Sequence, residues 1–223
     1  MFARLVPGPL VRFFARPYVA GGSMESALAS AETLLADGLL STLDLLGEDV
    51  ENAAAVDVNK NAYIELIDDV ARRFADVARR PTVSVKPSAF CVGFDDSAFD
   101  VIEKIVEHAH ERKVAVTIDM EDHRWTDITL QRSVDLFQRG FAVGTVLQTR
   151  LHRTEDDLKK IPEGMRVRLV IGIYPEPADI ATTEKNVMKE RMLTGAQELL
   201  PRGGYVEFAT HDEPTLRRFV QEV

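Results

Sequence analysis

The chain contains little cysteine, no long hydrophobic run and no excess of positive charge. Its single cysteine, Cys91, excludes an internal disulfide and suits a reducing compartment, where we expect it to pack as a small apolar side chain. None of its apolar stretches approaches the roughly 20 residues that cross a bilayer. With 36 acidic against 27 basic residues, the net charge of −9 argues against a nucleic-acid partner.

The first 22 residues lack the pattern of a secretory signal peptide. Apolar residues alternate there with arginines, without a continuous apolar core or a small-residue cleavage site. Pro7 and Pro9 would break a long helix. We therefore expect residues 1–22 to form an N-terminal arm docked on the same protein, residues 23–223 to form one domain, and the protein to be cytoplasmic.

Strand and helix patterns alternate through the rest of the chain. Apolar runs predict strands at residues 39–46, 82–90, 114–120, 141–147, from 166 onward and at 205–209. The segments between them carry apolar residues at helical spacing, as at Ile102, Ile105 and Ala109. This alternation is typical of a parallel sheet. Because no glycine-rich phosphate turn follows the first strand, we predict a TIM-like (β/α) barrel rather than an open doubly wound sheet.

The segment 166–177 combines a strand with an unusual charge. Its β-branched run suits a strand buried on both faces, and Gly172 thins the chain where a flat ligand could approach. Pro175 and Pro177 end the ladder. Arg168 needs an anionic partner, because a buried unpaired charge is strongly destabilising. For an isolated arginine, a structural carboxylate would be a sufficient explanation.

Polar side chains gather where the predicted strands end. In a (β/α) barrel those ends form one mouth, where the active site is built. The residues are Asp44, Glu48, Lys86, Asp119, Glu121, Gln148, Arg168, Tyr174, Thr210 and His211. The carboxylates, with Asp122, His123 and His211, also fit a divalent-metal enzyme, since such sites use oxygen and imidazole ligands.

Eight short motifs mark these positions in order. They are STLDLLGE (41–48), SVKPS (84–88), IDMED (118–122), VLQ (146–148), RTEDD (153–157), VRLV (167–170), GIYPEP (172–177) and ATHD (209–212). In this order and spacing the chain resembles the proline dehydrogenase family. The resemblance implies a flavoenzyme on a (β/α) barrel that oxidises L-proline to Δ1-pyrroline-5-carboxylate with FAD. It also implies a membrane quinone as electron acceptor, with the protein peripheral at the inner face of the membrane.

The resemblance implies a role for each matching residue. Lys86 would close the floor of the proline site, Asp119 would hold the neighbouring basic groups, and Tyr174 would form a wall. Arg168 would face flavin N5, and Gln148 would bind the pyrimidine edge of the isoalloxazine. The backbone at Val170 and Gly172 would lie against the ring, and Thr210 and His211 would lie around the ribityl–pyrophosphate part of the cofactor. The implied cofactor-binding residues are Gln148, Arg168, Val170, Gly172, Thr210 and His211, and no metal ligand is implied.

Two departures from the family pattern affect the expected activity. Ile171 stands where the family has a lysine that offers a cation to the cofactor, so we expect weaker FAD retention. The sequence ends at Val223, before the family's last two strands and its final helix, whose paired arginines hold the proline carboxylate. We therefore expect a C-terminally truncated barrel of about six strands, with impaired turnover and two apolar edges open to an oligomer or a completing polypeptide.

No other arginine pair is expected to replace the missing one. The pairs at 72–73 and 79–80 lie on or just beyond an early helix, and the pair at 217–218 lies on the closing helix, where solvated faces explain them better. Two further classes of function stay open: a divalent-metal barrel enzyme, and a non-catalytic degenerate paralogue that binds a partner through its open edges.

Overall fold

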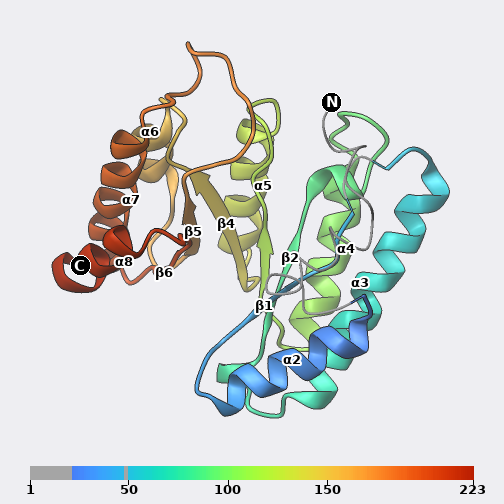
Figure 1. Cartoon of the computed structure of the whole chain (residues 1–223). Helices are drawn as coiled ribbons and strands as arrows, with labels where there is room; N and C mark the ends of the chain where they lie inside the picture. Colours follow the sequence, from blue (N-terminus) through green and yellow to red (C-terminus); the bar gives the residue numbers. More distant parts are fainter. Residues whose placement is uncertain (1–21, 48–49) are drawn as a thin grey trace, which may run out of the picture.

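The computed structural model of the chain describes residues 22–47 and 50–223. The predicted N-terminal arm, apart from Gly22, and the predicted site residue Glu48 lie outside the described residues. Six parallel strands form one sheet in the order β1-β2-β3-β4-β5-β6, curled into a half-barrel (Figure 1). The strands are β1 (Thr42–Asp44), β2 (Thr82–Val85), β3 (Val116–Ile118), β4 (Val143–Gln148), β5 (Arg166–Val170) and β6 (Tyr205–Phe208).

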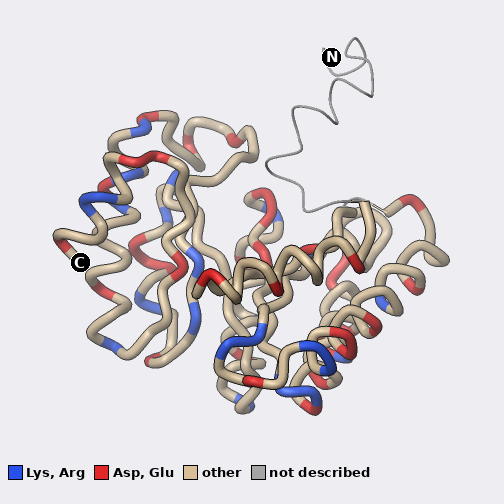
Figure 2. Tube along the Cα trace, turned by 60° about the horizontal axis from the view of Figure 1, so that its bottom comes forward, with Lys and Arg blue, Asp and Glu red and all other residues tan. Residues whose placement is uncertain are grey.

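Helices connect successive strands and cover the outer face of the sheet (Figure 1). No described helix is long and apolar enough to cross a membrane. Acidic and basic residues are interspersed along these helices (Figure 2). The helices are α2 (Met24–Ala36), α3 (Ala53–Arg73), α4 (Ala98–Glu111), α5 (Thr126–Gln138), α6 (Thr154–Lys160), α7 (Lys185–Leu199) and α8 (Glu213–Glu222), with 3₁₀ turns η2 (Val77–Arg79), η3 (Pro87–Ala89) and η4 (Leu200–Arg202).

Strand β5, next to the outer strand β6, has two different faces. Val167 and Leu169 are fully buried against the helices, whereas Arg166, Arg168 and Val170 alternate with them and are only partly buried. Successive side chains of a strand point to opposite faces, so the arginines lie inside the half-barrel. The prediction of a strand buried on both faces is therefore wrong for β5, whose inner face is only partly buried.

Several predicted boundaries move for identifiable reasons. The second strand ends at Val85 rather than at residue 90, because Pro87 lacks an N–H and begins the turn η3. Helix α3 ends at Arg73, although Pro81, which cannot continue a helix, comes only later in the chain. Arg80 explains this stop, since its guanidinium donates to the carbonyls of Phe74 at 2.6 Å and Ala71 at 3.1 Å.

The buried apolar side chains form two clusters. The first packs β1, β2 and β3 against α2 to α5, around residues such as Ile67 and Ile102. The second packs β4, β5 and β6 against α5 to α8, around Leu169 and Met192. The two outer strands, β1 and β6, have only three and four residues and place Thr42, Asp44 and Glu207 at alternating positions. The inward charges of Asp44 and Glu207 blunt these two edges, which the sequence predicted to be apolar.

Candidate functional site

A cavity of about 630 Å³ lies at the carboxyl ends of the strands. This volume is in the range of pockets that hold small-molecule ligands. All nine described residues that the sequence assigned to proline or cofactor line it, so the fold brings them together as predicted. They are Lys86, Asp119, Gln148, Arg168, Val170, Gly172, Tyr174, Thr210 and His211.

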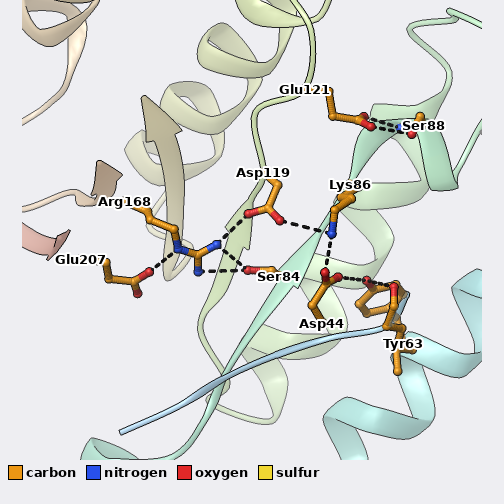
Figure 3. Close-up of polar contacts among 10 residues, drawn as sticks. Asp44, Tyr63, Ser84, Lys86, Ser88, Asp119, Glu121, Arg168 and Glu207 are labelled. Carbon is orange, nitrogen blue, oxygen red and sulfur yellow. Dashed lines mark hydrogen bonds and ion pairs between the residues drawn. The ribbon is translucent and has the colours of Figure 1, made fainter. Parts of the chain in front are cut away.

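Ion pairs of alternating sign cross the floor of this cavity (Figure 3). Lys86 Nζ contacts the carboxylate of Asp44 and lies 3.6 Å from Asp119 Oδ2. Arg168 Nη1 donates to Asp119 Oδ1 at 2.8 Å. Tyr63 supports this arrangement from below by donating its hydroxyl to Asp44 at 3.2 Å. Each charge is thus met by an opposite one, as a partly buried charge requires.

Arg168 is held on several sides. Its Nε donates to Glu207 at 2.7 Å, and its Nη1 and Nη2 each lie 3.1 Å from Ser84 Oγ. A guanidinium has five N–H groups. The contacts use one on Nε, two on Nη1 and one on Nη2, so within the described part of the chain one N–H on Nη2 remains for a ligand.

Burial changes the protonation behaviour of two groups at the cavity floor. Removal from water raises the pKa of the Asp119 carboxyl above its ordinary value of 3.8, and the neighbouring Arg168 and Lys86 oppose this rise. Burial, followed by the charge of Asp44, raises the pKa of the Tyr63 hydroxyl. Tyr63 therefore stays a neutral hydrogen-bond donor at physiological pH.

Gln148 and Gly172 form a closely packed section of the cavity wall. The Gln148 Nε2 donates to the carbonyl of Glu121 at 2.6 Å, whereas its Oε1 is buried without a partner among the described residues. Gly172 has a φ of 90°, and a Cβ there would overlap this Oε1 and lie 2.8 Å from Arg150 Cδ. A buried amide oxygen without a donor is destabilising. The arrangement therefore suits a flat ligand that carries an N–H.

The wall after β5 is fastened by two neighbouring loops. The buried carboxylate of Glu176 accepts the backbone N–H of His123 at 2.8 Å and also contacts the His123 ring. Arg150 Nη1 donates to the carbonyl of Tyr174. These contacts fix the backbone that presents Ile173 and Tyr174 to the cavity.

Three further charged residues, to which the sequence prediction gave no role, complete the cavity. Lys185 and Lys189 come from the first two turns of α7, and Asp212 precedes α8. Lys189 Nζ lies 2.7 Å from Asp212 Oδ1, and this contact, with hydrogen bonds from Thr215, lowers the pKa of Asp212 to about 2. The sequence did contain a signal for these residues. Two lysines stand at the start of the helix that follows β5, and a helix N-terminus with lysines favours anion binding.

Three residues of the metal hypothesis, Glu121, Asp122 and His123, make contacts outside the cavity. Glu121 accepts from the backbone N–H and hydroxyl of Ser88 at 2.7 and 2.6 Å, and Asp122 pairs with Arg124 at 2.6 Å. His123 contacts Glu176. In residues 22–47 and 50–223, no group of three or more His, Cys, Asp or Glu side chains is placed to hold a metal ion. The metal hypothesis therefore has no centre in the described part of the chain.

Comparison with known proteins identifies relatives over most of the chain. The sequence profile of the family described as proline dehydrogenase matches residues 27–176. Proline dehydrogenase of Deinococcus radiodurans is 34% identical over 216 residues, which cover 92% of this chain and 68% of the relative. Proline dehydrogenase 2 of Bacillus subtilis is 32% identical over 208 residues, which cover 91% of this chain and 66% of the relative.

Solved structures of proline utilization A share the fold. The protein from Bdellovibrio bacteriovorus, inactivated by N-propargylglycine, superposes with a TM-score of 0.82 at 21% identity, covering 96% of this chain and 27% of the larger one. A variant from Bradyrhizobium japonicum gives a TM-score of 0.75 at 20% identity, covering 96% and 26%. The chain spans about two-thirds of the length of the curated relatives. On the profile match and these identities, the chain belongs to the proline dehydrogenase family.

Proposed function

We propose that the chain forms the flavin- and proline-binding part of a proline dehydrogenase, which oxidises L-proline to Δ1-pyrroline-5-carboxylate with FAD. The family membership supports the reaction. One observation carries the proposal: the same cavity is lined by Arg168, which has one N–H left for a ligand, and by Gln148, whose Oε1 has no partner among the described residues. Together they offer a fixed donor and a fixed acceptor to a flat heterocycle.

The cavity residues fit the parts of FAD. Gln148 Oε1 would accept the imide N–H of the isoalloxazine, and Gly172 leaves room for the ring plane. Lys185 and Lys189, at the start of α7, would attract the pyrophosphate, because a helix N-terminus and lysines both favour negative charge. When bound, the flavin supplies the acceptor for a hydride from the substrate carbon.

The protein's own residues would hold the substrate and steady the charge that develops on hydride transfer. Arg168 is already fixed by Asp119 and Glu207, so it would offer its donor without reorganisation. Lys86 would close the proline site, and Tyr174 would be its wall. The buried apolar side chains of Met120 and Val146 would exclude water and so favour the deprotonated nitrogen that hydride loss requires.

We further propose a membrane quinone as the electron acceptor, with the protein peripheral at the inner face of the membrane. Exposed apolar side chains that follow β1, β2 and β5, namely Leu46, Phe94 and Ile173, support contact of the mouth with an apolar surface. The outer strands β1 and β6 support an oligomer or a completing polypeptide, since each pairs on one side only within the described sheet. Co-sedimentation with quinone-containing vesicles and light scattering test these two proposals separately.

The test of the main proposal is an absorbance spectrum of the purified chain incubated with FAD, before and after L-proline is added without oxygen. We expect a yellow protein that is bleached by L-proline and not by D-proline. The Arg168→Gln variant should lose bleaching, whereas Arg217→Gln, which alters an exposed pair with Glu213, should keep it. A folded protein that takes up no flavin, or a flavin that proline does not reduce, would contradict the proposal.

A further inference from the structure

Glu207 on the outer strand β6 joins two arginines of β5. Its Oε2 accepts from Arg168 Nε at 2.7 Å, and its Oε1 accepts from Arg166 Nη1 at 2.9 Å. The strand register pairs Glu207 directly with Arg168 and Tyr205 with Arg166. All three charged side chains are largely buried, with 16% to 25% of each exposed. Glu207 therefore belongs to the interior of the half-barrel.

The neighbouring strand leaves space for this arrangement. In the parallel pairing of β4 with β5, Gly144 of β4 lies opposite Arg166, and a Cβ added to Gly144 would lie 2.9 Å from Arg166 Cβ. On its other side the Arg166 guanidinium lies 4.5 Å from the centre of the Tyr205 ring. Backbone and side chains on both sides thus hold Arg166 at Glu207.

Glu207 completes a balanced series of charges. From β1 to β6 the contacts run Asp44, Lys86, Asp119, Arg168, Glu207 and Arg166, with three acids alternating with three bases (Figure 3 shows all but Arg166). Glu207 does not line the 630 Å³ cavity but an adjoining one of about 300 Å³, which shares Arg168 and Asp119 with it. Glu207 therefore does not touch a cavity ligand, and it reaches the cavity lining through its contact with Arg168.

We propose that Glu207 is a positioning residue that fixes Arg168 and offsets its charge, and thereby sets how strongly the site stabilises negative charge on the bound flavin. This inference rests on the proposed function. Without the Glu207 charge, the interior series carries an excess positive charge beside Arg168. Removal of Arg166 has the opposite effect, because Glu207 then offsets Arg168 alone.

The test uses the FAD-loaded chain and two readouts other than turnover, namely the flavin midpoint potential and the dissociation constant of sulfite. Sulfite adds through its sulfur lone pair to flavin N5, and the adduct places negative charge on the ring. Glu207→Gln keeps the shape and one acceptor for Arg168 Nε but removes the charge. We expect a more positive potential and sulfite binding tighter by about ten-fold, the order expected for one charge in a partly buried network.

Two variants complete the design. Arg166→Gln should shift both readouts in the opposite direction, and it decides the question even where Glu207→Gln fails to fold. Glu103→Gln removes the same charge from a remote pair with Arg139 and should change neither readout. If both interior variants alter only thermal stability, Glu207 is merely structural and the inference is overturned while the proposed function stands. If the chain takes up no flavin, the proposed function and this inference fail together.

Discussion

Glycines and buried polar atoms determine the shape of the cavity at the scale of single residues. Gly172 combines a positive φ with close contact to Gln148 and Arg150, so two separate penalties oppose any larger side chain there. Because Gly172 has no side chain, Gln148 and Arg150 can pack directly against its backbone. A substitution at Gly172 therefore tests how this part of the cavity wall is held together.

Gly172→Ala is expected to lower the free energy of unfolding by about 2–3 kcal/mol, from backbone strain plus the overlap with Gln148. Denaturant unfolding measures this change. Gly164→Ala is the matched control, because Gly164 also has a positive φ, of 78°, but open space around its Cβ, so strain alone should cost about 1 kcal/mol. Equal losses in the two variants would show that the contact with Gln148 carries no energy.

Ile171 gives a second prediction at this scale. It lines the cavity and is 37% exposed, so a longer side chain has room there. Ile171→Lys should slow the release of FAD several-fold, because it adds a cation at the cavity. Val187→Lys adds the same charge on α7 outside the cavity lining and should have little effect. Stopped-flow measurement of FAD fluorescence gives the release rate of each variant. Unchanged or faster release from Ile171→Lys than from the parent chain would contradict the prediction.

At the scale of elements, charge contributes to attaching helix α8 to the rest of the protein, beside the stacked rings of Phe208 and Phe219. Asp212 caps its N-terminus by accepting from Thr215 N at 3.0 Å and pairs with Lys189 of α7. Because these contacts hold the pKa of Asp212 at about 2, the folded state prefers the ionised carboxylate. The stability that it contributes is present above the ordinary pKa of 3.8 and is lost as the pH falls towards 2.

The Asp212→Asn variant isolates this charge, because asparagine keeps the capping acceptor. We expect it to be less stable than the parent chain at pH 7, and the difference to disappear as the pH is lowered from about 4 to 2. Unfolding free energies, or amide exchange of α8, measured across this range test the expectation. A difference that does not depend on pH would assign the role of Asp212 to geometry instead.

The strands and their ends could be predicted from the sequence, whereas some contacts between strands could not. The alternation of patterns predicted six parallel strands, and the clustering of polar residues at strand ends predicted one shared mouth, because strand direction alone brings those ends together. The roles of Glu207 and Arg166 were not predictable in this way. Their contact depends on the register between β5 and β6 and on the space left by Gly144, and neither is encoded in a local pattern.

At the scale of the whole molecule, the two apolar clusters divide the protein into two parts that share α5. Leu169→Ala in the second cluster should destabilise it by about 3 kcal/mol, since Leu169 is fully buried. Native-state hydrogen exchange should then show faster opening of β4 to α8 than of β1 to α4. Ile67→Ala in the first cluster should give the reverse order, and uniform acceleration in both variants would indicate a single cooperative unit.

The alternation along β5 also has a consequence for how the protein acquires its ligand. A slip of one residue would turn Arg166 and Arg168 outward onto the helices and Val167 and Leu169 into the barrel. The register of β5 that buries Val167 and Leu169 against the helices therefore also directs the Arg168 guanidinium into the half-barrel. A nascent chain can thus offer Arg168 to a ligand only once this alignment is complete, so ligand capture would report that β5 has reached its native register.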